Sequence, residues 1–371
     1  MSGVYISYPF CAQKCTYCNF ASGVLPRELE SSYVETLRAA LREIAWPWTP
    51  ETVYFGGGTP SQMDSDAIES LLAAIPGRPP SEKWSEATIE AAPGTITRDR
   101  AEAWRRAGIN RASLGVQSFV QRELARTGRK HTAEIVESDV RILRAAGIHS
   151  ISIDLIAGLP DQTHESWSRS LDWIERCETP HASVYMLEVD DDSRLGREIL
   201  LNGSRYGARE VPPDDAIADF YEIAVERLAR VGLARYEISN FARQGFESRH
   251  NLKYWRREPY LGFGADAHSF MVSDDGEWRW RNAESAAGYV ANPSAIERTP
   301  ADPLAERFFL GLRLAEGLAL KDAGDWAAFE ESIQRRIAEG LLEFDGNRLR
   351  LTNRGVLLSN EVFADFVGVA V

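Results

Sequence analysis

Near its N-terminus the chain reads Tyr5-Ile-Ser-Tyr-Pro-Phe-Cys11-Ala-Gln-Lys-Cys15-Thr-Tyr-Cys18-Asn-Phe20. Three of the four cysteines lie in this stretch, with the spacing C-x3-C-x2-C. Cysteine thiolates at such short spacings hold iron–sulfur clusters, and three of them leave one iron of a [4Fe–4S] cluster without a protein ligand. We therefore predict that Cys11, Cys15 and Cys18 hold a cluster whose open iron can bind and reduce a small molecule.

Structural zinc and disulfides are the two alternatives for these cysteines. A structural zinc normally takes four Cys or His ligands, and no histidine or fourth cysteine lies near the motif. Three clustered cysteines leave one thiol over after pairing, and no secretory segment precedes them. The spacing therefore favours an iron–sulfur cluster in a reducing compartment, and we expect a cytoplasmic protein.

The motif and its flanks resemble the radical S-adenosylmethionine (SAM) superfamily, whose members carry C-x3-C-x2-C after the first strand of a β/α barrel. Tyr5, the Pro-Phe pair before the first cysteine and Tyr17 before the third resemble the branch that contains oxygen-independent coproporphyrinogen III oxidase and the HemW-like haem chaperones. The oxidases carry a further cysteine where this chain has Phe20, as HemW-like proteins do. Two positions depart from the family pattern, since Ser7-Tyr8 replaces His-Ile and Ala92 replaces Asn.

Strand and helix patterns alternate along the first half of the chain. Apolar runs predict strands at residues 4–7, 52–55, 87–91, 111–116, 151–155 and 183–187, with helices between them. Such alternation implies a parallel sheet with right-handed crossovers. We predict an α/β fold, an incomplete (β/α)6 radical SAM barrel over residues 1–235, followed by a smaller C-terminal α+β, winged-helix-like domain of the HemW/HemN type over 236–371.

Barrels of this type place their chemistry at the C-terminal ends of the strands. A glycine triplet follows the second predicted strand, where glycines let the backbone approach a ligand closely, and polar residues end the later strands. SAM needs carboxylates for its ribose hydroxyls and ammonium group and a cation for its own carboxylate. In the resembling family the SAM-contacting positions correspond to Tyr5, Gly57, Gly58, Thr59, Glu90, Gln117, Arg129 and Asp154. We add Tyr17 to these cofactor-binding residues.

A second motif, His250-Asn251-Leu-Lys-Tyr254-Trp255, follows the predicted barrel. A histidine among aromatic residues suits axial ligation and ring stacking of haem, whereas the alternative is a hydrogen-bonded structural histidine. The H-N-x-x-Y-W pattern is characteristic of HemW-like proteins and favours haem, with His268 as a second candidate ligand. We interpret Cys177 as a buried small apolar residue.

Composition narrows the range of partners. The chain has 42 basic and 55 acidic side chains and a formal charge of −13, which argues against nucleic acid as a partner. No apolar run reaches the ~18 residues of a membrane span. Two functions remain: a chaperone that carries haem to haem proteins, respiratory ones among them, or an enzyme that cleaves SAM to decarboxylate coproporphyrinogen III or, less favoured, to act on another tetrapyrrole. Phe20 and the His250 motif favour the chaperone, while SAM cleavage and a homodimeric state are left open.

Overall fold

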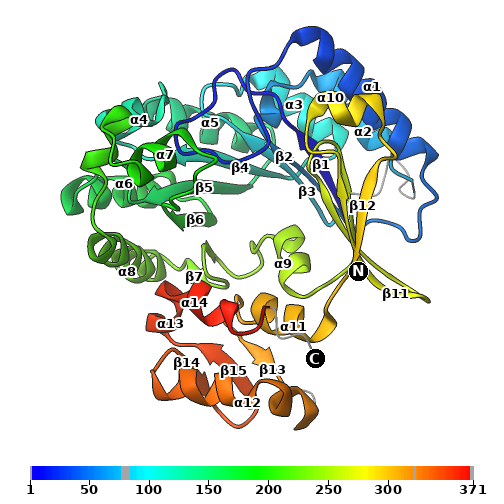
Figure 1. The fold of residues 1–371 in the computed structure, drawn as a ribbon. Coiled ribbons are helices and arrows are strands. Elements are labelled where there is room, and N and C mark those ends of the chain that lie inside the picture. The colour runs from blue at the N-terminus through cyan, green and yellow to red at the C-terminus, as the bar shows by residue number, and fades with distance from the viewer. Residues whose placement is uncertain (1, 77–83, 321–322, 368–371) are drawn as a thin grey trace.

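A computed structural model describes residues 2–76, 84–320 and 323–367, and in these ranges twelve strands form one continuous sheet (Figure 1). Its order is β12-β11-β10-β9-β1-β2-β3-β4-β5-β6-β8-β7. The barrel strands are β1 (Gly3–Tyr8), β2 (Thr52–Gly57), β3 (Glu86–Ala91), β4 (Arg111–Gln117), β5 (Ser150–Ala157) and β6 (His181–Met186), all parallel to their neighbours in this set. The predicted β/α alternation is confirmed.

Helices cover the outer face of the curved sheet (Figure 1). They are α1 (Arg27–Glu43), α2 (Ser65–Ala74), α3 (Arg98–Ala107), α4 (Gln121–Thr127), α5 (Ala133–Ala145), α6 (His164–Cys177) and α8 (Asp214–Arg230). Their apolar stripes pack on the strands because each helix repeats its apolar residues at 3.6-residue spacing. Thr163 begins α6, where its hydroxyl accepts the backbone N–H of Ser166 at 3.2 Å, as a capping residue should.

The barrel does not close. The free side of β6 pairs with the antiparallel β8 (Asn240–Ala242), which is followed by the edge strand β7 (Ala234–Arg235). The free side of β1 instead pairs in parallel with β9 (Tyr260–Phe263). This confirms an incomplete barrel.

Residues 260–300 extend this sheet beyond β1. After β9 come β10 (His268–Ser273), β11 (Gly276–Asn282) and β12 (Ile296–Pro300), each antiparallel to its predecessor in the sheet, with α10 (Ala286–Ala291) in the last connection. The sheet thus continues past the predicted boundary at residue 235. The preceding helix, α9 (Arg249–Trp255), lies against the N-terminal ends of the barrel strands, which we call the barrel floor.

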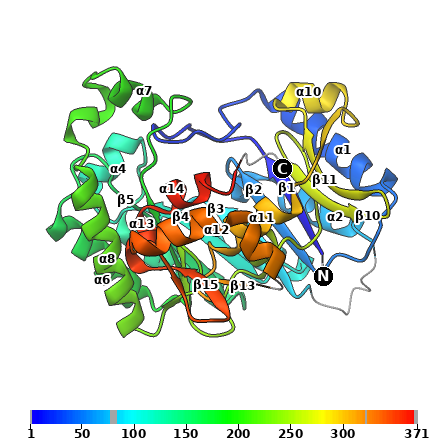
Figure 2. The same ribbon diagram turned by 60° about the horizontal axis from the view of Figure 1, so that its bottom comes forward.

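A smaller α+β unit follows over residues 303–364, which confirms a C-terminal domain, while the predicted division of the chain at residue 235 stays a prediction. Its described elements are α11 (Pro303–Gly311), β13 (Leu318–Ala319), α12 (Ala323–Ala338), β14 (Leu342–Phe344), β15 (Arg348–Leu351), α13 (Asn353–Leu357) and α14 (Ser359–Ala364). Phe308, Phe329 and Phe366 form its core, with ring centroids 4.8–5.1 Å apart. It lies on the floor side of the barrel (Figures 1 and 2), where Ile238 donates its backbone N–H to Arg313 at 3.1 Å.

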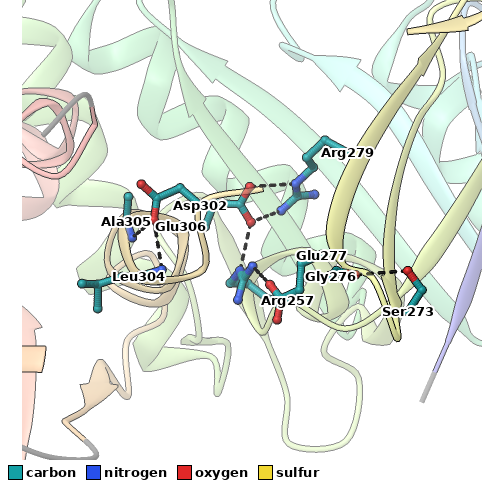
Figure 3. Close-up of polar contacts among 9 residues, drawn as sticks. All are labelled: Arg257, Ser273, Gly276, Glu277, Arg279, Asp302, Leu304, Ala305 and Glu306. Carbon is teal, nitrogen blue, oxygen red and sulfur yellow. Dashed lines mark hydrogen bonds and ion pairs between the residues drawn. The ribbon is translucent and has the colours of Figure 1, made fainter. Parts of the chain in front are cut away.

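Charged side chains join this unit to the sheet at what we call the Glu306 cluster, formed by Glu306, Arg257, Arg279 and Glu277 (Figure 3). Arg279 donates to both carboxylate oxygens of Glu306 at 2.9 and 2.7 Å, and Arg257 donates to one of them at 2.9 Å and also pairs with Glu277. Burial alone would raise the pKa of Glu306, but the two guanidinium groups lower it. The carboxylate therefore stays ionised and holds α11 to β11.

Among the described residues, no helix combines the length and the apolar character that crossing a membrane requires.

Candidate functional site

The cysteine loop begins directly after β1, at the mouth of the barrel. Hydrogen bonds hold the loop at several points, since Cys11 donates its N–H to Gly23 at 2.8 Å and Thr16 donates its own to Thr127, the last residue of α4, at 3.2 Å. Leu195, in α7 (Arg194–Leu200), donates its N–H to Thr16 at 2.8 Å. The loop is thus fixed between α4 and α7, and its three cysteines are free and partly exposed.

The spacing of the three thiols can be compared with that of the ligands of a zinc ion. A tetrahedral zinc with Zn–S distances near 2.3 Å would bring its sulfur ligands to about 3.8 Å from one another. Within the described ranges, the group of three potential ligands whose atoms all lie within 4.8 Å is Asp190, Asp191 and Asp192, not the cysteines. The three sulfur atoms therefore do not all lie within 4.8 Å of one another, and three cysteine ligands are a set that an iron–sulfur cluster takes.

The glycine loop after β2 lies directly against the cysteine loop. Gly58 donates its N–H to Tyr8 at 2.7 Å, and Thr59 donates its N–H to Phe10 at 2.9 Å. A Cβ added to Gly58 would come within 2.7 Å of the Phe10 oxygen and 2.9 Å of the Cys11 sulfur, so a larger residue cannot occupy this position without moving the loops. The sequence-predicted cluster ligands and glycines are thus brought together.

Glu90, at the end of β3, connects the glycine loop to the barrel interior. Its Oε2 accepts the N–H of Gly57 at 3.1 Å, and its Oε1 accepts the hydroxyl of Tyr54 at 2.9 Å. Burial, aided by the charge of Asp154, raises the pKa of Glu90 to about 7. Glu90 can therefore change between a neutral and a charged form near neutral pH.

Asp154 lies in the same interior, on β5, and three serine hydroxyls hold it. Ser113, Ser152 and Ser183 donate to its carboxylate at 2.7 to 3.1 Å from β4, β5 and β6. Burial raises the pKa of Asp154, and these hydrogen bonds oppose the rise. The carboxylate is held in one orientation beside Glu90.

Gln117 and Arg129 complete the mouth on the side of β4. The backbone of Gln117 has a φ of 71°, and the pairing of β4 with β5 is irregular between Gly115 and Gln117. The buried Oε1 of Gln117 has no hydrogen-bond partner, a costly state for a buried amide. Arg129 donates to the Gly115 carbonyl at 2.6 Å and to the Tyr17 hydroxyl at 3.1 Å, and so it links the end of β4 to the cysteine loop.

The barrel interior and the loops next to the cysteine loop thus contain two carboxylates, a glycine loop, an arginine and an unpartnered amide oxygen. This donor set fits SAM, whose ammonium, carboxylate and ribose groups need such partners. A cluster held by Cys11, Cys15 and Cys18 would supply an electron and an open iron for the methionyl end of SAM. The chain's own residues would orient SAM against it.

The structure does not bring His250 to this site. His250 lies at the barrel floor with 0% of its surface exposed, with Nδ1 at 2.8 Å from the Thr52 hydroxyl and Nε2 at 2.8 Å from that of Tyr254. Burial lowers the pKa of its imidazole to about 3. His268, at the start of β10, is exposed. As expected, Cys177 is a buried free thiol.

Sequence reasoning missed several polar residues that support the site. Tyr54 was not among the predicted site residues, although it lies beside Tyr5 in the register of β1 and β2. The serines around Asp154 were not predicted either, and they lie on three different strands. The alternation of Ser152 and Asp154 with isoleucines in β5 was a usable signal, because alternate residues of a strand point to the same face.

Fold and site together define a radical SAM protein with an open partial barrel. In agreement, residues 5–174 match the radical SAM superfamily and residues 299–358 match the HemN C-terminal domain. The Escherichia coli coproporphyrinogen III oxidase HemN, a radical SAM enzyme, has a similar structure, with a TM-score of 0.81 and 21% identity over 98% of this chain and 89% of HemN.

Curated relatives then specify the branch. The haem chaperone HemW of Lactococcus lactis is 33% identical over 99% of this chain and 97% of its own, and that of Bacillus subtilis is 32% identical over 99% of this chain and 100% of its own. The chain belongs to the HemW family of the radical SAM superfamily.

Proposed function

We propose that this protein is a haem chaperone that binds haem and delivers it to haem proteins, with a [4Fe–4S] cluster and SAM in its mouth site. The observation that carries the proposal is Phe20, whose side chain is 60% exposed beside the cysteine loop. The resembling oxidases carry a further cysteine at this position. An exposed aromatic ring can pack on a porphyrin. The curated relatives matched over nearly their full length are named haem chaperones, which supports the same function.

Other apolar side chains near the mouth support a flat apolar ligand. Val24 and Val189 are exposed, and Asn19 donates to Asp190 at 2.8 Å, which places the segments that carry Phe20 and Val189 next to each other. Burial of such side chains under a porphyrin would remove apolar surface from water. Haem is therefore proposed to approach the cysteine loop on this side.

The axial ligand of haem has two candidates. His250 is the residue that the family motif indicates, and its ring must give up the hydrogen bond to Thr52 or Tyr254 before a nitrogen can bind iron. His268 is exposed and needs no such change. His250 lies at the floor, at the other end of the strands from Phe20, so a haem held by His250 would bind at the floor after α9 has moved away, and not at the mouth. We retain His250 as the first proposal and His268 as the second.

Haem titration of the anaerobically reconstituted protein tests this function. We expect stoichiometric haem binding, a changed absorption spectrum in His250→Ala because the iron loses an axial nitrogen, and transfer of haem to an apo-haem protein. A changed spectrum in His268→Ala alone would move the ligand to His268. Absence of haem binding by the parent protein would contradict the chaperone function.

The alternative is oxidative decarboxylation of coproporphyrinogen III. It is favoured by the complete set of proposed SAM-binding residues around the glycine loop. The same reconstituted protein should be given SAM, a reductant and coproporphyrinogen III, and the products measured. We expect no protoporphyrinogen IX. Its SAM-dependent formation at many turnovers would establish the oxidase instead.

A further inference from the structure

The imidazole of His250 is fixed in one orientation at the barrel floor. Thr52, which holds its Nδ1, is the first residue of β2, and Tyr254 holds its Nε2 from the next turn of α9. A Cβ added to Gly3, the first residue of β1, would lie 3.0 Å from the imidazole Cε1. Glu86, the first residue of β3, accepts the backbone N–H of His250 at 2.9 Å. The starts of three barrel strands thus contact this one residue.

The ring of Tyr54 stacks on this imidazole. The two ring centroids are 5.3 Å apart with an interplanar angle of 29°. Tyr54 also stacks with Tyr5, its neighbour in register on β1, at 6.0 Å and 22°. Two fixed rings in contact with Tyr54 restrict its side chain, so its hydroxyl has a defined position inside the barrel.

That hydroxyl reaches the mouth site. It donates to Glu90 Oε1 at 2.9 Å, while Gly57 donates its N–H to Glu90 Oε2 at 3.1 Å. Burial raises the pKa of Tyr54 well above its usual value, so the hydroxyl keeps its proton and remains a donor. A carboxylate has further lone pairs beyond two such bonds, and these are free for a cationic ligand.

We propose that His250 and Tyr54 are positioning residues for SAM. The imidazole fixes the Tyr54 ring, and the Tyr54 hydroxyl holds the Glu90 carboxylate against the glycine loop, where it meets the ammonium end of SAM. Without the hydroxyl, the carboxylate keeps one of its two hydrogen bonds and must be ordered by SAM itself, which weakens binding. This role is separate from haem binding, since it requires His250 to stay on the floor.

A double-mutant cycle on the haem-free protein with its reconstituted cluster tests the proposal. SAM affinity should be measured for the parent, Tyr54→Phe, Glu90→Gln and the double variant. We expect Tyr54→Phe to weaken SAM binding by about 10- to 150-fold, the size of one hydrogen bond to a charged group. In the Glu90→Gln background the same change should cost almost nothing, because coupled residues are not additive. Full additivity, or unchanged affinity in Tyr54→Phe, would overturn the proposal.

Two further readouts separate positioning from a loss of stability. The hydrogen bond from Tyr54 lowers the pKa of Glu90, so the pH midpoint of SAM binding should rise in Tyr54→Phe. Tyr221→Phe is the matched control, since it removes a buried tyrosine hydroxyl that donates to the Ile238 carbonyl. This control should lower thermal stability without moving the midpoint. The other titratable groups that act on or near Glu90, left unaltered in these variants, are Tyr5, Asp154, Tyr185 and Tyr254.

His250→Leu keeps side-chain volume and removes both hydrogen bonds and the stacking partner of Tyr54. We expect weaker SAM binding, parent-like iron and sulfide content, and no further loss when it is combined with Tyr54→Phe. Parent-like SAM affinity in His250→Leu would show that the imidazole does not position Tyr54 for SAM binding. Because haem is absent throughout, these outcomes do not depend on whether the protein carries haem.

Discussion

Glu90 shows how one residue can make cofactor binding depend on pH. Its pKa is raised to about 7 from the usual 4.5, mainly by burial, so the carboxylate gains a proton as the pH falls below neutral. The neutral form no longer attracts an ammonium group. We expect SAM to bind about tenfold more weakly at pH 6 than at pH 8, as linkage to a group of this pKa requires.

Titration calorimetry of the reconstituted protein across this range measures the effect. Glu90→Gln is the control, because a neutral amide cannot titrate, and its SAM affinity should be low and nearly flat with pH. A parent profile that is equally flat would show that Glu90 does not meet a cation of SAM.

The four cysteines should differ in their effect on the cluster. Ala in place of Cys11, Cys15 or Cys18 removes one of three ligands, and we expect loss of most iron and sulfide because no other thiol is near. Cys177→Ala is the matched control, since Cys177 is buried in α6. Iron and sulfide analysis checks both, and a full cluster in Cys15→Ala would contradict the ligand assignment.

Among single residues, the sequence identifies site residues when their residue type is rare and the members of the motif lie close together in the chain. The cysteines and the glycines after β2 are of this kind. The unpartnered oxygen of Gln117 and the contact of Tyr54 with Glu90 are not, because each depends on a backbone irregularity or on a neighbouring strand. The floor position of His250 was also beyond prediction, since its partner Thr52 lies 198 residues earlier in the chain and Gly3 lies earlier still.

The glycine loop and the cysteine loop behave as one element of the mouth. Gly58→Ala would place a methyl group 2.9 Å from the Cys11 sulfur and 2.7 Å from the Phe10 oxygen, closer than van der Waals contact allows. We expect the loops to separate and the reconstituted cluster content to fall by more than half. Gly23→Ala is the matched control on the cysteine loop, because a Cβ there meets nothing within 4 Å. Iron analysis of both variants measures the cluster content, and equal content in Gly58→Ala and Gly23→Ala would contradict the prediction.

Element boundaries were predictable where the hydrophobic period was clear. Strand β4 occupies Arg111–Gln117, one residue more than the predicted 111–116, and β5 extends the predicted 151–155 to Ser150–Ala157. The addition of β9 to β1 was not predicted, because the two strands are more than 250 residues apart and local patterns do not identify pairing partners.

At the scale of the whole molecule, the Glu306 cluster is one of the contacts that dock the C-terminal domain on the barrel. Glu306→Ala leaves Arg257 and Arg279 without their shared carboxylate, and removing one partner of a buried pair costs about 3–5 kcal/mol. We expect a lower urea midpoint and faster proteolytic cleavage near residue 300. Glu226→Ala, which removes an exposed pairing with Arg230, should change neither, because such surface pairs contribute little. Parent-like urea unfolding in Glu306→Ala would show that other contacts hold the domain.

The pairing of β9 with β1 also has a consequence for biosynthesis. β1 carries the cysteine loop at its end, yet one of its two neighbours in the sheet is residues 260–263. At roughly 5–20 residues per second, a ribosome needs about 10–50 s to reach that strand after it has made the first. During this interval β1 lacks one of its two neighbouring strands, so we expect the cluster to be inserted after translation is nearly complete.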